Sequence, residues 1–275
     1  MPDSAERPKL LFLTNLYNGS PEEDIFLTEQ LRKHFTISIV HPLDSEAVED
    51  NFTTALVRNI WPSHEYKDQK AALIRRLTRK GLLPASEAER GYLEQDNYLE
   101  KEYLLDIYAK GYPVIPTIDS VSNLEVLGDC AAYFIKPKDR CDGEGSEKLS
   151  REELIKRELT DYLIQPHIAF DYEVCFYFVD GAFVYAFKVS NRLAGKDYEP
   201  YQPSPDDMAF AEKFVRWNRL DYGLQRVDAV RVHDTQELLL TELEDFGPYL
   251  YILELPEPVR EKAVRSIVES LLKRL

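Results

Sequence analysis

The chain has 275 residues, and its 34 basic and 49 acidic side chains give a formal net charge of −15 at pH 7. A negative field repels phosphate backbones and anionic lipids, so we expect no nucleic-acid partner and no membrane partner. The N-terminal apolar run covers only residues 10–13, which predicts neither a signal peptide nor a membrane span. Cys130, Cys141 and Cys175 match neither a disulfide framework nor a zinc pattern, so we expect a cytoplasmic protein.

The N-terminal part of the chain has the pattern of a parallel α/β unit. Apolar residues at 9–14 predict a buried strand, and a proline followed by acids at 21–24 begins a helix. Further strands are expected at 36–40 and 55–60, and a further helix from 67 to about 80. Because strand, helix and strand follow one another through short links, a parallel sheet flanked by helices is the expected layer.

The rest of the chain is expected to be richer in strands. A polar, irregular stretch at 84–98 predicts a boundary between two lobes, and strand structure is expected to begin again at 114–117. The predicted helices beyond that boundary cover residues 99–110, 150–159, 204–218 and 258–275. The last of these is amphipathic, which predicts that one apolar stripe packs on the core.

A β-hairpin near the C-terminus carries the strongest functional signal, because two apolar runs flank a polar turn. If the turn is centred on Thr235, Asp228 faces Glu242 on the opposite strand. By the same register, Arg226 faces Glu244. Residues two apart in a strand point the same way, so these four side chains are expected to meet on one face.

The same register places Leu238 and Leu240 on that face, which we therefore expect to be partly buried. Three carboxylates this close repel one another unless a cation is present. Oxygen ligands at the end of a sheet suit a hard cation such as Mg²⁺, which usually arrives with the phosphates of a nucleotide. The alternative is a cross-strand ion pair between Arg226 and Glu244 with two spare acids beside it.

A lysine at the end of an apolar strand is the second signal. Lys136 closes the apolar run that begins at Ala131, and a turn containing Gly143 and Gly145 follows it. A flexible loop with free backbone N–H groups beside a lysine is suited to fold over phosphates. A simple connecting loop is the alternative.

A second hairpin is predicted around Asp180 and Gly181, which form a typical two-residue turn. Its register places Glu173 opposite Lys188. The pair could be a cross-strand ion pair, or Glu173 could bind a sugar hydroxyl while Lys188 binds a phosphate, and the pairing does not decide. Just upstream, residues 161–168 form a short strand broken by proline, whose backbone groups could hold a planar base.

Taken in order, these residues resemble an ATP-grasp enzyme over roughly residues 96–255. The motifs that carry the resemblance are Lys101, Gly111 to Thr117, Ile135 to Pro137 with the glycine loop, Gln165 and Pro166, Glu173, Lys188, Arg226 to Asp228, and Glu242 to Glu244. The stretch from Arg58 to Trp61, followed by Glu65 and Tyr66, is similar to a segment in the branch near glutathione synthetase and the cycloserine-pathway ligase.

The resemblance implies an α/β (α+β) protein with an ATP-grasp fold. A Rossmann-like domain would cover residues 1–95, and the ATP-grasp domain would cover residues 96–275. Within it, a small β-rich lobe at about 118–165 and a second β-rich lobe would clasp ATP. The implied cofactors are ATP and Mg²⁺ (or Mn²⁺).

The resemblance also implies roles for individual residues. The implied nucleotide-binding residues are Lys101, Lys136, Gly143, Gly145, Gln165, His167, Ile168, Glu173 and Lys188. The implied metal ligands are Asp228, Glu242 and Glu244, although many relatives have asparagine at the position of Glu244. Arg226 and Lys188 would be catalytic, stabilising charge on the transferring phosphoryl group.

The implied activity is that of an ATP-dependent carboxylate–amine (or thiol) ligase. It would act through an acylphosphate on small, amino-acid-like substrates and release ADP and phosphate. An ATP-grasp kinase or phosphotransferase, and a nucleotide-binding module without turnover, are the alternatives. Arg58, Trp61 and Arg192 are candidates to hold a substrate carboxylate between the lobes. A homodimer is compatible with the sequence, and the identities of the acid and the amine stay open.

Overall fold

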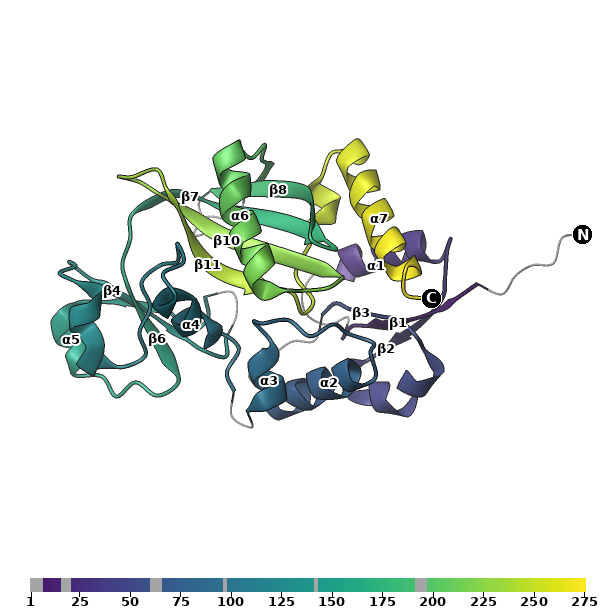
Figure 1. Ribbon diagram of the computed structural model, residues 1–275, viewed down its shortest axis with the longest axis horizontal. Helices are drawn as coiled ribbons and strands as arrows, with labels where there is room; N and C mark the ends of the chain where they lie inside the picture. The colour runs from purple at the N-terminus through teal and green to yellow at the C-terminus, as the bar shows by residue number, and fades with distance from the viewer. Residues whose placement is uncertain (1–6, 16–20, 60–65, 96–97, 141–142, 191–196) are drawn as a thin grey trace, which may run out of the picture.

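The computed structural model describes residues 7–15, 21–59, 66–95, 98–140, 143–190 and 197–275. Their strands form three sheets, shown in Figure 1. The N-terminal sheet is parallel and has the order β2 (Thr36–Val40), β1 (Lys9–Leu13) and β3 (Ala55–Val57). The helices that follow in this part of the chain are α1 (Pro21–Leu31), α2 (Lys67–Arg79) and α3 (Arg90–Glu94).

Both faces of the central strand β1 are buried, as expected for a parallel sheet. Leu10 and Phe12 belong to a core that also contains residues of α1 and of the C-terminal helix, whereas Leu11 and Leu13 pack with residues of α2. The predicted parallel α/β unit is confirmed. The stretch predicted to be irregular, at 84–98, contains the short helix α3.

The small sheet is antiparallel, and it lies apart from the N-terminal sheet in Figure 1. Its order is β5 (Glu147–Leu149), β4 (Tyr133–Pro137) and β6 (Tyr162–Pro166), accompanied by α4 (Tyr103–Ala109) and α5 (Arg151–Ile155). The strand expected at 114–117 is reduced to an isolated bridge between Val114 and Leu240. Pro113 and Pro116 explain the difference, because proline cannot donate to a ladder.

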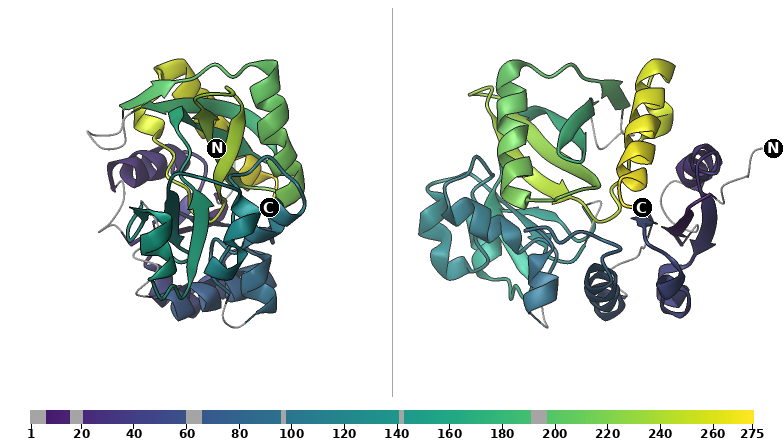
Figure 2. Two further views of the ribbon diagram at one scale, coloured as in Figure 1. Left: turned by 90° about the vertical axis from the view of Figure 1, so that its left-hand side faces the viewer. Right: turned by 45° about the vertical axis from the view of Figure 1, so that its right-hand side comes forward.

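The large sheet is antiparallel and has five strands. They run in the order β11 (Leu238–Glu244), β10 (Leu224–Val232), β7 (Phe170–Val179), β8 (Ala182–Ser190) and β9 (Asp197–Pro200). The helix α6 (Pro205–Asn218) covers one face, and α7 (Glu257–Leu272) lies against the other, between this sheet and the N-terminal sheet (Figure 2). Short 3₁₀ helices cover Pro42–Ala47, Glu49–Asn51, Val121–Leu127 and Ile252–Glu254.

A β-bulge in β11 makes part of the predicted hairpin register wrong. Asp228 pairs with Glu242 as predicted, but the register then shifts, so that Ala229 pairs with Leu240. Thr241 is therefore an extra residue in β11, and an extra residue reverses the alternation of faces beyond it. The prediction that Leu238 and Leu240 share the face of the acids is wrong, because both pack in the core on the side of α6.

A second bulge makes the predicted register of the other hairpin wrong as well. The register between β7 and β8 shifts between Tyr177 and Phe178. Beyond the shift Glu173 pairs with Val189, and Lys188 pairs with Val174. The predicted pair of Glu173 with Lys188 is therefore wrong. A tight turn predicts register only for the residues next to it, because a bulge further along the strands displaces every later pair.

A continuous core joins the N-terminal sheet to the large sheet. One cluster of buried residues contains Phe12 of β1, Leu27 of α1, Tyr177 of β7 and Ile267 of α7. The predicted division of the chain at residue 95 stays a prediction, and α7 packs across it. Within the described residues, every helix is too short or too polar to cross a bilayer.

Candidate functional site

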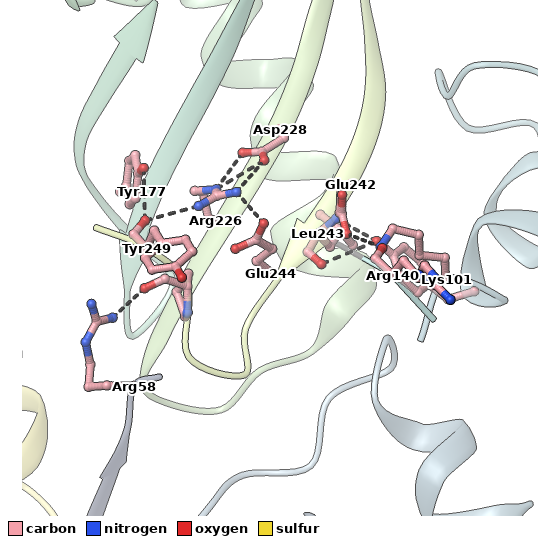
Figure 3. Close-up of polar contacts among 12 residues, drawn as sticks. Arg58, Lys101, Arg140, Tyr177, Arg226, Asp228, Glu242, Leu243, Glu244 and Tyr249 are labelled. Carbon is pink, nitrogen blue, oxygen red and sulfur yellow. Dashed lines mark hydrogen bonds and ion pairs between the residues drawn. The ribbon is translucent and has the colours of Figure 1, made fainter. Parts of the chain in front are cut away.

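The guanidinium group of Arg226 is the centre of a buried polar cluster on β10 (Figure 3). Its Nε lies 2.8 Å from Oδ1 of Asp228, and its Nη2 lies 2.8 Å from Oδ2 of the same carboxylate. Nη2 also donates to the Glu244 carboxylate, while Nη1 donates to the Tyr249 carbonyl oxygen at 3.1 Å. The arginine is thus held in one orientation by two acids and one carbonyl group.

The phosphate-binding lysines implied by the sequence lie against the neighbouring strand β11. Lys101, which is 3% exposed, places its Nζ 2.9 Å from Oε1 of Glu242 and also donates to the Arg140 carbonyl. Lys136, at the end of β4, donates to the Thr241 carbonyl oxygen at 3.1 Å. The bulge at Thr241 therefore brings a backbone acceptor of the large sheet to a lysine of the small sheet.

The charges in this cluster are unevenly compensated. Burial acts to raise the pKa of Glu242, but the ammonium groups of Lys101 and Lys136 outweigh it and hold the pKa below its ordinary value. Burial raises the pKa of Glu244 to about 8, and the carboxylates of Asp228 and Glu242 add to this effect against the opposing guanidinium of Arg226. The negative charge of Asp228 and Glu242 thus makes ionisation of Glu244 unfavourable.

The raised pKa of Glu244 predicts a pH-dependent stability. Between the ordinary pKa of 4.5 and about 8, Glu244 binds a proton in the folded state that it has lost in the unfolded state. The stabilising contribution is therefore present below that window and is lost as pH rises through the folded pKa. Glu244→Gln, which is neutral at every pH, should show a smaller fall in melting temperature than the wild type across this window. Equal pH profiles would contradict the assignment.

The donor set fits a hard cation that is shared with phosphates. Among the described residues, no three acid, histidine or cysteine side chains are arranged to hold a metal by themselves. Arg226 contacts Asp228, and Lys101 contacts Glu242. The acids nevertheless offer carboxylate oxygens on one face, and Mg²⁺ usually takes only one or two of these besides phosphate oxygens and water. A bound cation would also favour the ionised form of Glu244.

The residues implied to bind the base and the ribose lie on two sheets. Gln165 of β6 is buried and donates to Thr117 Oγ1 at 2.8 Å. The backbone N–H of His167 donates to the Ala132 carbonyl at 2.9 Å, while Ile168 is half-buried. Glu173 of β7 is 5% exposed, and by register it shares the face of the large sheet that carries Arg226 and Asp228.

The glycine loop connects β4 to β5. Gly143 and Gly145 both have positive φ, at 77° and 72°, a region where other residues are strained. A side chain at Gly145 would approach the Pro137 ring to 2.9 Å, so the loop lies close to the strand that carries Lys136. Cys141, inside this loop, lies outside the described residues.

Lys188 is not brought together with the other implied site residues. It pairs with Val174, whose side chain packs in the core on the side of α6, so Lys188 lies on the face of the large sheet opposite to Arg226. Its Nζ lies 4.7 Å from the centre of the Tyr172 ring. The geometry therefore gives no support to a role for Lys188 near the γ-phosphate.

Arg58 is also placed differently from the prediction. It is 1% exposed, donates from Nε to Asp24 Oδ1 at 3.1 Å, and contacts Glu23 and the Pro248 carbonyl oxygen. Its hydrogen-bonding groups are therefore committed to α1 and to the segment that follows β11, and it is not available to a substrate carboxylate. The other two carboxylate candidates, Trp61 and Arg192, lie outside the described residues.

Sequence reasoning missed some groups of the cluster, because the sequence gives almost no signal for them. Tyr103 contacts the backbone of Leu243 between the two glutamates of β11, yet in the sequence it is an ordinary apolar position of a helix. The carbonyl groups of Arg140 and Tyr249 contribute through the backbone, which any residue could supply. The position of Tyr103 two residues after Lys101 is the one available hint.

Neither a family model nor a curated protein sequence matches the chain. Solved structures do match, over nearly the whole chain. The D-cycloserine synthetase DcsG has a TM-score of 0.70 at 18% identity, covering 96% of this chain and 99% of that chain. A D-alanine–D-alanine ligase from Bacillus anthracis, complexed with ATP, has a TM-score of 0.67 at 12% identity, covering 98% of both chains.

A RiPP-associated ATP-grasp ligase from Chryseobacterium gregarium, in complex with ADP and a leader and core peptide, has a TM-score of 0.64 at 15% identity. The alignment covers 98% of this chain and 97% of that chain. At these identities the likeness concerns the fold. The chain has the ATP-grasp fold, and the predicted fold is confirmed.

Proposed function

We propose that the protein is an ATP-dependent ligase that joins a carboxylate to an amine or a thiol. The observation that carries the proposal is the convergence of Arg226, Asp228, Glu242 and Glu244 on one face of the large sheet, with Lys101 and Lys136 at its edge. Cations and acids in this arrangement suit phosphoryl transfer, which depends mainly on positioning and electrostatics.

In the proposed reaction, a substrate carboxylate oxygen attacks the γ-phosphorus of ATP. The bond from that phosphorus to the β–γ bridging oxygen breaks, and ADP leaves. The amine nitrogen then attacks the carbonyl carbon of the acylphosphate, phosphate leaves, and the nitrogen loses a proton. The products are an amide, ADP and phosphate. A thiol acceptor would give a thioester by the same steps.

Each of the clustered residues would have a separate role in this reaction. Lys101 and Lys136 would bind phosphate oxygens, and Arg226 would stabilise the charge that develops on the transferred phosphoryl group. Asp228, Glu242 and Glu244 would hold Mg²⁺, which when bound supplies positive charge to the phosphates. Lys188 is left out of this assignment, because the sheet separates it from Arg226.

The base and the ribose would bind between the small sheet and the large sheet. The segment from Gln165 to Ile168 would contact adenine, and Glu173 would bind the ribose. The loop carrying Gly143 and Gly145 would cover the phosphates and protect the acylphosphate from water. Two of the matched structures contain ATP or ADP, and one of these also contains a leader and core peptide, which supports a nucleotide site here and leaves both small molecules and peptides as acceptors.

The first experiment is to measure ADP release from Mg·ATP with a panel of amino acids and other small carboxylates, each with an amine. Wild type is compared with Glu242→Gln, which removes the partner of Lys101. We expect turnover that requires one acid and one amine, and a loss of about 100-fold or more in the variant. Product analysis identifies the reaction, since a ligase yields free phosphate and a new amide, whereas a kinase yields a phosphorylated product.

Glu237→Gln is the matched control, because Glu237 is an exposed glutamate of the same hairpin. It should retain wild-type turnover. If Glu242→Gln also turned over ATP at the wild-type rate, the assignment of this face would be wrong. A wild-type protein that binds Mg·ATP but consumes it with no acid–amine pair, peptides included, would contradict the proposed ligase.

A further inference from the structure

The strand that carries two of the proposed metal ligands is an edge strand. β11 is the last strand of the large sheet, and β10 is its only strand partner among those described. Alternate backbone groups of an edge strand point away from the sheet and need other partners. A strand without such partners frays easily, and fraying here would displace Glu242 and Glu244 together.

Side chains and backbone groups from other parts of the chain supply hydrogen-bond partners to the outer edge of β11. The N–H of Leu240 donates to the Pro113 carbonyl at 2.9 Å. The carbonyl of Thr241 accepts from Lys136 at 3.1 Å. At Leu243, between the two glutamates, the partner is a side-chain hydroxyl rather than backbone or a lysine.

That hydroxyl belongs to Tyr103, the first residue of α4, which is 5% exposed. The hydroxyl oxygen accepts from the Leu243 N–H at 2.6 Å, and the O–H group donates to the Leu243 carbonyl at 3.3 Å. One phenol therefore satisfies both backbone groups of this residue, as a neighbouring strand would. Burial and the nearby Glu242 raise the pKa of Tyr103 well above its ordinary value, so the hydroxyl stays protonated and able to donate.

Tyr103 also links the acids to the proposed phosphate site. Lys101, two residues earlier, contacts the Glu242 side chain, and its own N–H donates to the Lys138 carbonyl at 3.0 Å. The segment 101–103 thus touches β11 at a side chain and at the adjacent backbone. These two contacts tie the beginning of α4 and the turn before it to β11.

The geometry points to Tyr103 as a positioning residue for the metal–nucleotide site, an inference that rests on the proposed function. Its hydroxyl holds the backbone of Leu243 so that Glu242 and Glu244 present their carboxylates at a fixed spacing, in register with Lys101. Groups that orient metal ligands commonly affect metal affinity by about 10–100-fold when removed. Tyr103 itself touches neither substrate nor cation in this assignment.

The test is the binding of ADP at increasing concentrations of Mg²⁺, measured by calorimetry for wild type and Tyr103→Phe. We expect the Mg²⁺ concentration that half-saturates ADP binding to rise about 10-fold in the variant. ADP binding without Mg²⁺ should change little. In turnover, the KM for Mg·ATP should rise more than kcat falls, because the ring and its packing are kept.

Tyr222→Phe is the matched control. Tyr222 is a half-buried tyrosine whose hydroxyl donates to the Gly81 carbonyl at 3.2 Å, just beyond the end of α2 rather than on α4 or β11. It should lose a comparable hydrogen bond, worth about 1 kcal/mol of stability, without any change in the Mg²⁺ dependence. If Tyr103→Phe kept the wild-type Mg²⁺ dependence, or if both variants shifted it equally, a positioning role for Tyr103 would be excluded.

Hydrogen exchange provides a measurement that does not depend on folding of the variant. In the wild-type protein, the Leu243 amide should exchange as slowly as amides in the interior of the large sheet, although it lies on an edge strand. Fast exchange at Leu243 would overturn the inference and leave the proposed function intact. If wild type bound no ADP with Mg²⁺ at all, the proposed function would fail, and this inference would fail with it.

Discussion

Replacing Arg226 by methionine is expected to lower both the stability and the turnover of the protein. The guanidinium makes a two-bond contact with Asp228, which is 3% exposed, and contacts Glu244 and the Tyr249 carbonyl. Removing one partner of a buried ion pair leaves an uncompensated charge, which typically costs about 3–5 kcal/mol. We expect a loss of that size in the free energy of unfolding, measured by urea denaturation.

The variant Arg226→Lys tests whether the site needs only the positive charge of Arg226 or also the geometry of its guanidinium group. Lysine keeps the positive charge but cannot donate along two parallel bonds to one carboxylate. We expect the lysine variant to recover much of the lost stability and to lose ATP turnover by about 100–1,000-fold, as when an oriented donor to a transition state is removed. Turnover close to that of the wild type would contradict the catalytic role of Arg226.

Arg231→Met is the matched control for Arg226→Met. Arg231 lies on the same strand but on the opposite face, and its Nη2 lies 2.6 Å from Oδ1 of the largely buried Asp207. The control should lose stability through the same cause, an unpaired buried acid, while Mg·ADP binding stays at the wild-type level. A loss of nucleotide binding in both variants would show that unfolding, rather than the site, explains the result for Arg226.

Replacing Arg58 by methionine is the second change with a large expected effect. Arg58 is fully enclosed and neutralises two neighbouring acids, Glu23 and Asp24, at the beginning of α1. Loss of the guanidinium should destabilise the fold by about 3–5 kcal/mol, again because buried carboxylates lose their partner. The same side chain contacts Pro248, so the segment that follows β11 should also loosen.

A double variant tests the cause of that loss. Combining Arg58→Met with Glu23→Gln removes one of the orphaned charges and should recover part of the stability, giving a coupling energy between the two sites. Arg76→Met should cost less and serves as the control, because the buried Glu49 that it leaves keeps a second cation, Lys80, at 3.2 Å. If Arg58→Met left stability unchanged but raised the KM for a carboxylate substrate, the original assignment of Arg58 to substrate binding would be correct.

The two hairpins show how far local pattern predicts register. The predicted pairs of Asp228 with Glu242 and of Arg226 with Glu244 are found, but only because a bulge offsets an error at the turn: next to the turn Ala229 pairs with Leu240, one residue away from the predicted register, and the bulge at Thr241 restores that register beyond it. The predicted pair of Glu173 with Lys188 is not found, because there the register beside the turn was correct and the bulge moved the later pairs away from it. A bulge depends on how two whole strands twist and pack, and no residue in these strands marks its position.

For the charged residues too, one property could be predicted from the sequence and another could not. The chemistry of Asp228, Glu242 and Lys136 could be inferred from the residues because acids and lysines at the ends of apolar strands are costly to bury without partners, whereas the role of Lys101 came only from the family resemblance. The ion-pair partners of these residues could not be inferred from the sequence. Arg58 looks the same in the sequence whether it binds a substrate or neutralises Glu23, since the two differ only in what surrounds the guanidinium.

By itself the sequence determined the order of the main helices and strands, the ATP-grasp resemblance, and the set of acids and lysines that share a strand end. These properties follow from hydrophobic periodicity and residue type, which act over short distances along the chain. Only the tertiary structure decided which face each residue occupies, which acid each cation neutralises, and that Tyr103 holds the edge of β11. Those outcomes depend on contacts between residues far apart in the sequence, such as Tyr103 and Leu243, and such contacts form only when separate elements pack together.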